Sequence, residues 1–207
     1  MEFFANTNIQ FYIAAYLIGS IPFGLILAKQ FAGINIKEEG SKSIGATNVL
    51  RVVKQSNPAL AKKLGIATVL LDALKGMVVL FSAMSAGVST ETLWAVAVLS
   101  VLGHCYSIYL GLEGGKGVAT GLGVLLVLIP IPTLIGAAVW GFCAKVLKVS
   151  SISSLLGLVA LVIAALFLSD SLGVDSYSPL YIITFIIFYK HIPNIIRLIK
   201  GQEGKVA

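Results

Sequence analysis

Long apolar runs follow one another along this chain, separated by short polar stretches. Five of these runs are near the length of about 20 residues that a transmembrane helix needs. They are Ile9–Ala28, Leu64–Ala86, Thr92–Leu110, Ser151–Ser169 and Pro179–Ile199. Runs of this length predict an all-α fold, a bundle of helices that crosses a membrane several times.

A further apolar section, Val118–Val149, is too long for one crossing, and Pro130 and Pro132 interrupt it. Proline lacks a helix N–H and clashes with the preceding turn, so either one kinked helix or two short ones fit. Lys and Arg concentrate in cytoplasmic loops. A turn on the outer side at the prolines leaves no Lys or Arg outside, whereas six spans would force a basic group across. We therefore expect about seven transmembrane segments, with the N-terminus outside and the C-terminus in the cytoplasm.

Composition agrees with a single integral membrane domain over residues 1–207. Hydrophobic residues make up 57% of the chain and charged residues 12%, whereas a soluble domain has about 25% charged residues. The net charge of +6 follows from the basic inner loops. It predicts contact with anionic lipid headgroups and no nucleic-acid partner. The first run lacks a basic leader and a small-residue cleavage site, which predicts a retained span instead of a signal peptide.

The two cysteines, Cys105 and Cys143, have neither CxxC nor metal-ligand spacing and are expected to be packing residues. No cluster of His, Cys and carboxylates has the spacing of a metal site. We therefore expect no metal and no soluble cofactor.

A Gly-Gly-Lys-Gly loop stands between two apolar runs. Gly114, Gly115 and Gly117 allow successive N–H groups to converge, and Lys116 adds a compact positive charge that suits a phosphate dianion. Glycine-rich runs also occur where helices pack closely, so phosphate binding and packing both remain open. The loop lacks the first glycine and the Ser or Thr of a nucleotide-binding P-loop.

Three other polar motifs fall on the expected cytoplasmic side. The segment 40–51 is rich in hydroxyl, amide and cationic groups and is either an anion-binding loop or a solvated connector. Serines that begin the fifth run either cap a helix or expose N–H groups to an anion. His104 and His191 are candidates for a general base or for an ordinary helix-end hydrogen bond. The candidate residues in these motifs are Ser41, Thr47, Asn48, Arg51, Ser150, Ser153, His191 and Asn194.

Asp72 and Lys75 lie inside the second run, three residues apart on one helical face. An isolated charge there would cost several kcal/mol, so we expect the two side chains to pair. A structural ion pair and a direct role in binding substrate both fit the sequence.

Taken in order, these motifs resemble those of the bacterial membrane glycerol-3-phosphate acyltransferases that use acyl-phosphate donors, the PlsY family. The resemblance covers nearly the whole chain. It is carried by Gly19–Gly24, Gly45–Asn48 with Arg51, Asp72 with Leu74–Gly76, Gly103-His104 with Gly114–Thr120, and His191 with Asn194-Ile195, Arg197 and Glu203.

The resemblance implies transfer of a fatty acyl group from acyl phosphate to the 1-hydroxyl of glycerol 3-phosphate. The products would be lysophosphatidate and phosphate, made at the cytoplasmic face of the bacterial inner membrane during phospholipid biosynthesis. It assigns the loop Gly114–Gly117 to the glycerol 3-phosphate headgroup. It implies that the reacting phosphates are lined by Ser41, Arg51, Lys116, Ser150, His191 and Asn194. Further binding roles fall to Thr47, Asn48, His104 and Ser153, and supporting roles to Asp72, Lys75 and Glu203.

Two other functions are weighed against this one. An acyl-CoA-dependent acyltransferase would be expected to carry a His-x4-Asp pair, but Tyr109 and Ile196 stand five residues after the two histidines. An anion or phosphate transporter would be expected to show inverted repeats and a site at the membrane midplane. The chain has no persuasive repeat, and its polar motifs gather on one side.

The chain also departs from the usual family pattern. Lys42 and Ser43 replace a Gly-Asn pair, Ser107 replaces a proline, and Glu113 stands where a basic residue is common. We expect a rebuilt loop around Lys42, weaker anion attraction near Glu113, and a changed substrate preference.

Overall fold

The computed structural model describes residues 5–168 and 173–205, and its regular elements within those ranges are all helical. They are α2 (Thr7–Gly19), α3 (Phe23–Ala32), α4 (Ala46–Val53), α5 (Pro58–Ser85), α6 (Thr90–Cys105), the 3-10 turn η1 (Ile108–Leu110), α7 (Val118–Leu128), α8 (Pro130–Leu147), α9 (Ser150–Leu168) and α10 (Ser178–Ile199). The expected end of the fifth run, Ser169, lies outside the described residues.

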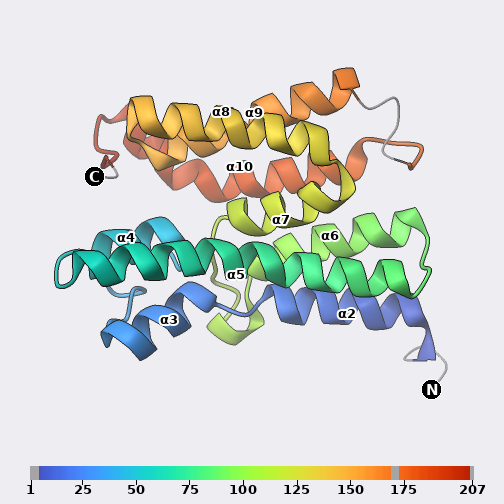
Figure 1. Ribbon diagram of the computed structural model, residues 1–207, viewed down its shortest axis with the longest axis horizontal. Coiled ribbons are helices and arrows are strands. Elements are labelled where there is room, and N and C mark those ends of the chain that lie inside the picture. Colours follow the sequence, from blue (N-terminus) through green and yellow to red (C-terminus); the bar gives the residue numbers. More distant parts are fainter. Residues whose placement is uncertain (1–4, 169–172, 206–207) are drawn as a thin grey trace.

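The long helices lie side by side along the length of the molecule (Figure 1). In this view α2, α3, α5 and α6 form one group, α8, α9 and α10 form another, and α7 lies between them. The contacts agree, because α2 packs on α6, α8 packs on α9, and α7 touches α5, α6 and α8. The short helix α7 therefore links the two groups.

Six described segments are long and apolar enough to span a membrane, and α7 is a shorter apolar helix. The expected break at Pro130 is confirmed, since α7 ends at Leu128 and α8 begins at the proline. With 11 residues, α7 is about 16 Å long, roughly half of the hydrocarbon thickness. It packs within the bundle, with Gly121 and Gly123 among its buried residues.

The first apolar run was expected to be one helix, but it is interrupted between Gly19 and Phe23, where α2 ends and α3 begins. Pro22 has no N–H to donate to the preceding turn, which explains the interruption. The break exposes the carbonyl of Ile21, and this oxygen accepts a hydrogen bond from Lys75 at 2.8 Å. The same oxygen also accepts from the N–H of Phe23 at 3.1 Å, so the interior lysine adds a second, charged donor to a carbonyl at the break.

Glycines allow the first helices to pack closely. A Cβ on Gly19 would collide with the carbonyl oxygen of Ser100, and one on Gly103 with that of Tyr16. Both contacts join α2 to α6. Between membrane helices, small residues of this kind let the two backbones approach each other.

The short helix α4 occupies part of the segment that the sequence suggested to be a loop. Gly45 precedes it in an extended conformation, and Val49, Val52 and Val53 are buried against Ile36. These valines give α4 one apolar face. The helix packs on α5 and holds the opposite, polar face of the segment over the site described next.

Candidate active site at the head of an apolar groove

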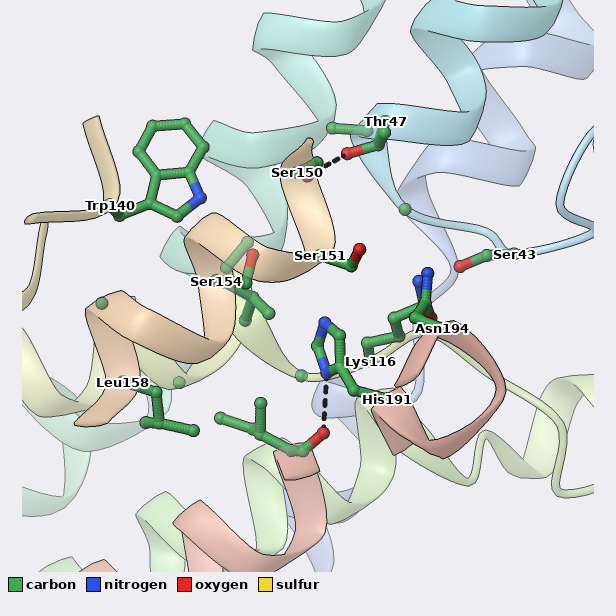
Figure 2. Close-up of a pocket in the computed structure, with 18 of the residues that line it drawn as sticks. Ser43, Thr47, Lys116, Trp140, Ser150, Ser151, Ser154, Leu158, His191 and Asn194 are labelled. Carbon is green, nitrogen blue, oxygen red and sulfur yellow. Dashed lines mark hydrogen bonds between the residues drawn. The ribbon is translucent and has the colours of Figure 1, made fainter. Parts of the chain in front are cut away.

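A cavity of about 530 Å³ is lined by residues from the segment before α4, from helices between α4 and α10, and from the segment after α10. Its polar lining includes Ser41, Ser43, Thr47, Arg51, Lys116, Ser150, Ser151, His191, Asn194, Arg197 and Glu203. Its apolar lining includes Val69, Leu122, Leu125, Ala137, Trp140, Leu158, Leu161 and Ile187. Figure 2 shows Trp140 and Leu158 on one side of the cavity and Ser43 and Asn194 on the other. The cavity can therefore hold a ligand with a polar head and a hydrocarbon chain.

Glycines form part of the apolar wall. A Cβ on Gly136 of α8 would lie 2.7 Å from the carbonyl oxygen of Gly157 on α9, and a Cβ on Gly157 would lie 2.9 Å from Cβ of Trp140. Both glycines line the cavity. Their lack of side chains brings α8 and α9 together while leaving the space beside them open.

Three helices begin at the polar side of the cavity. The first N–H groups of a helix have no partner within the helix and carry the positive end of its dipole, so helix N-termini bind anions. The lining residues from these first turns are Ala46 and Thr47 of α4, Val118 and Ala119 of α7, and Ser150 and Ser151 of α9. The hydroxyls of Thr47 and Ser150 lie 3.1 Å apart, which brings two of the N-termini together.

Two cations reach the cavity without a partner. Lys116 and Arg51 line it, and neither has a hydrogen bond or an ion pair to another side chain in the described ranges. Burial lowers the pKa of Lys116 to about 8. Because removing an ammonium from water is costly, a bound anion would compensate for that loss. These two groups make the cavity suitable for a phosphate.

His191 presents one ring nitrogen to the cavity. Its Nδ1 lies 2.7 Å from the carbonyl oxygen of Ile187, and a carbonyl can only accept, so Nδ1 carries the proton. The other nitrogen, Nε2, is then left with a lone pair. Figure 2 shows this nitrogen on the side of the ring that faces Ser151 and the centre of the cavity. His191 can therefore accept a proton or a hydrogen bond from a ligand.

Glu203, in the segment after α10, closes one edge of the cavity. Its carboxylate accepts hydrogen bonds from Ser151 at 2.8 Å, from Arg197 at 2.7 Å, and from the amide of Asn194. Burial raises the pKa of Glu203, but these three hydrogen bonds and the positive charge of Arg197 outweigh burial and lower the pKa below its ordinary value. The amide oxygen of Asn194 is buried without a partner among the described residues and remains free to accept from a ligand.

Asn48 organises the loop before α4. Its amide nitrogen donates to the carbonyls of Ile36 and Ser43 at 2.9 Å, and its amide oxygen accepts from the N–H of Ser41 at 2.8 Å. Although Asn48 lines the cavity, its polar atoms are occupied by the loop itself. It acts by holding Ser41 and Ser43 at the cavity wall.

A buried charged network lies beneath the glycine loop. Lys75 donates to Asp72 at 2.8 Å and to Nδ1 of His104 at 2.9 Å. The expected pairing of Asp72 and Lys75 is confirmed. The N–H of Gly115 donates to the carbonyl oxygen of His104 at 3.0 Å, and a Cβ on Gly115 would collide with Nε2 of the same histidine. Gly115, the residue before Lys116, therefore packs directly against His104.

Sequence comparisons identify the family. The profile of the glycerol-3-phosphate acyltransferase family matches residues 9–201. A glycerol-3-phosphate acyltransferase of Aliarcobacter butzleri (strain RM4018) is 75% identical over 206 residues, and the match covers 100% of both chains. One from Sulfurimonas denitrificans is 61% identical over 207 residues, again covering 100% of both. The chain belongs to the glycerol-3-phosphate acyltransferase family. It is an integral membrane acyltransferase of phospholipid biosynthesis.

Solved structures agree with this membership. The crystal structure of PlsY, an integral membrane glycerol 3-phosphate acyltransferase, in its glycerol 3-phosphate form has a TM-score of 0.85 and 33% identity, covering 98% of this chain and 96% of that one. The lysophosphatidic acid form of PlsY has a TM-score of 0.82 and 33% identity, covering 97% and 95%. The resemblance noted in the sequence is thus confirmed at the level of family and fold.

Most residues that the family resemblance singled out lie together. Ser41, Thr47, Asn48, Arg51, Asp72, His104, Lys116, Gly117, Ser150, His191, Asn194 and Glu203 all line the cavity. Ser153 does not, because its hydroxyl is buried and donates to the carbonyl of Val149 at 2.9 Å. Gly114 and Gly115 line an adjoining pocket instead, where the N–H of Gly115 is already used. In the described part of the chain, no group of three His, Cys, Asp or Glu residues could hold a metal ion.

Ser43, Ser151, Ser154 and Arg197 also line the cavity. They lie in the polar motifs that the sequence singled out, but they are not among the individual phosphate-binding or catalytic candidates named there. One departure from the family pattern, Ser107, has a clear structural partner. Ser107 donates to the carbonyl of Ser20 at 2.6 Å, so it braces the break between α2 and α3.

Proposed function

We propose that this member of the family transfers a fatty acyl group from acyl phosphate to the 1-hydroxyl of glycerol 3-phosphate. The observation that carries the proposal is one cavity that combines unpaired cations and three helix N-termini with an apolar groove. Both substrates bear a phosphate, and the donor also bears a hydrocarbon chain. Such a donor would lie with its chain along α8 and α9 and its phosphate among the polar residues.

The chemistry requires alignment more than activation. An acyl phosphate is a mixed anhydride, so no covalent enzyme intermediate is needed. The glycerol oxygen bonds to the carbonyl carbon, the bond from that carbon to the phosphate oxygen breaks, and the hydroxyl proton leaves with the phosphate. Lys116 and Arg51 stabilise the phosphate charges, and the helix N-termini offer N–H groups to the developing oxyanion. Ser41 and Asn194 orient the reacting groups.

The hydroxyl proton has two acceptors within this arrangement. One is Nε2 of His191, whose lone pair is free because Nδ1 donates to Ile187. The other is an oxygen of the donor phosphate, which becomes more basic as the phosphate departs. Either acceptor completes the proton balance, since the proton ends on the phosphate released.

We place the site at the cytoplasmic face of the bacterial inner membrane. The basic residues around α4, at the end of α8 and at the end of α10 lie at one end of the bundle, whereas Glu91 and Asp175 lie near turns at the other. Positive charge favours the cytoplasm. This orientation leaves the start of α2 outside and the end of α10 inside.

The decisive experiment supplies the purified, detergent-solubilised protein with palmitoyl phosphate and glycerol 3-phosphate, in parallel with palmitoyl-CoA. Lysophosphatidate formation is measured by mass spectrometry, and phosphate release is measured alongside it. The proposal requires product from palmitoyl phosphate with one phosphate released per acyl group transferred. Product only from the CoA thioester would overturn the donor assignment.

A further inference from the structure

A second pocket of about 450 Å³ adjoins the polar side of the catalytic cavity. Its walls are the loop after α3, the glycine loop and the end of α10. The two cavities share Ser41, Ser43, Lys116, Asn194 and Arg197. Figure 2 shows Ser43 and Asn194 on the side of the catalytic cavity away from Trp140. The second pocket, called the outer pocket below, therefore meets the site from the side opposite the apolar groove.

The outer pocket is strongly basic. Five cationic side chains and one carboxylate line it: Lys37, Lys42, Lys116, Lys190, Arg197 and Glu113. A concave surface lined by one sign of charge concentrates ions of the opposite sign and speeds their association. A small phosphorylated molecule would therefore be attracted to this pocket.

Lys42 is held in an unusual backbone conformation. Its φ of 57° is in the left-handed region, which costs a residue with a side chain roughly 1 kcal/mol or more compared with glycine. Such strain persists where the surroundings impose it, often beside a functional site. The exposed Lys42 thus places a positive charge at the outer pocket, at a backbone position that glycine would adopt with less strain.

Glu113 reduces the positive charge on one side of the pocket. Its carboxylate lies 2.9 Å from Nζ of Lys37, joining the glycine loop to the loop after α3. The Glu113 side chain is 74% exposed, and exposed ion pairs contribute little to stability. The main effect of this contact is therefore to reduce the positive charge of the pocket. Lys42 and Lys190 are left without a carboxylate partner among the described residues. Lys190 instead lies 4.6 Å from the centre of the Tyr106 ring.

We propose that the outer pocket is a capture site for the phosphate dianion of incoming glycerol 3-phosphate, held by Lys42 and Lys190 before Lys116 and Arg197 receive it. The inference rests on the proposed function, because it supposes that glycerol 3-phosphate is the acceptor. It gives the water-soluble substrate a route of its own, separate from the groove that holds the acyl chain. Glu113 weakens the capture by pairing with Lys37.

The test measures initial rates of lysophosphatidate formation by the full-length protein in a neutral detergent, with palmitoyl phosphate saturating and glycerol 3-phosphate varied. The KCl concentration is set to ~10 mM and ~100 mM, where the screening length falls from about 30 to about 10 Å. Lys42→Gln should raise KM for glycerol 3-phosphate about threefold to tenfold at low salt, with a smaller change in kcat. Glu113→Gln should lower KM about threefold under the same conditions.

Three further variants separate local charge from other effects. Lys62→Gln removes an equal charge from an exposed site on α5 outside the pocket and should change KM less than about twofold. Lys42→Arg keeps the charge and should restore the wild-type KM. Lys42→Gly removes both charge and backbone strain and should match Lys42→Gln.

Equal KM changes in Lys42→Gln and Lys62→Gln would overturn the capture site, as would an effect of Lys42→Gln that does not weaken at the higher salt concentration. A large difference between Lys42→Gly and Lys42→Gln would trace the effect to the loop backbone and would also overturn it. If the wild-type protein makes no product from palmitoyl phosphate, the proposed function fails first. If the wild-type protein makes product normally and Lys42→Gln leaves KM unaltered, the capture site is overturned and the proposed function stands.

Discussion

Nζ of Lys75 lies 2.9 Å from Nδ1 of His104, within the interior between α5 and α6. An ammonium has only donors, so Nδ1 must accept and the ring proton lies on Nε2, the nitrogen that faces Gly115. The same ammonium donates to Asp72 and to the carbonyl of Ile21 at the break between α2 and α3. Lys75 therefore connects the break in the first span to His104, the residue against which the glycine loop packs.

Lys75→Met should destabilise the protein by about 3 kcal/mol or more, because it leaves the carboxylate of Asp72 buried without a cation. The double variant Asp72→Asn/Lys75→Met should lose clearly less than the sum of the two single variants. Apparent melting temperatures in one detergent provide the measurement. Additive losses would mean that the pair does not act as a unit.

Gly115→Ala should lower kcat/KM about 100-fold, because the new Cβ collides with Nε2 of His104 and displaces Lys116 from the cavity. Gly141→Ala is the matched control, since a Cβ there meets nothing within 4 Å. It should keep wild-type activity and gain slightly in stability. Near-normal kinetics in Gly115→Ala would show that the glycine loop tolerates a shift and does not position Lys116.

The lowered pKa of Lys116, about 8, predicts a loss of activity at alkaline pH. The side chain is charged below this pKa and neutral above it, so kcat/KM for glycerol 3-phosphate should fall as pH rises through about 8. Lys116→Arg keeps its charge throughout this range. The alkaline fall should therefore disappear from the pH profile of that variant, even if its maximal rate is lower. An unchanged profile would assign the fall to another group.

Glu203→Ala should lower both stability and kcat/KM, the latter about tenfold, because Arg197, Ser151 and Asn194 lose their shared acceptor. Glu203→Gln keeps the shape of the side chain and separates the contribution of charge. Since the pKa of Glu203 is below its ordinary value, the stability that its charge provides is complete above the ordinary value and is lost as pH falls through the lowered one. The difference in melting temperature between wild type and Glu203→Gln should shrink over that acidic range. A constant difference would exclude the charge as its source.

The sequence predicted the helical membrane fold well because long apolar runs have few alternatives in a bilayer. Proline was a less consistent guide. Pro130 begins a new helix as expected and Pro22 precedes one that was not expected, yet Pro193 lies inside α10 without ending it. Whether a missing N–H interrupts a helix depends on packing that a single sequence does not reveal.

The convergence of distant polar motifs was also predictable. Successive spans cross the membrane in opposite directions, and the polar motifs fall at the ends that share the expected cytoplasmic side. The direction of each side chain was not. On α9, Ser151 faces the cavity and Ser153 faces away, because two residues along a helix differ by about 200° around its axis. Asn48 was expected to bind substrate, but its polar atoms bind its own loop, which only the folded path of residues 36–48 reveals.

The cavity wall includes residues from Gly40 through Gly204, so its parts are separated by most of the chain. Glu203, near the end of the chain, bridges α9 and α10. A ribosome that is still inserting the earlier spans therefore carries no assembled site. His191 and Asn194 of the cavity lie on α10, so synthesis and membrane insertion must pass this last helix before the protein can make lipid at its full rate.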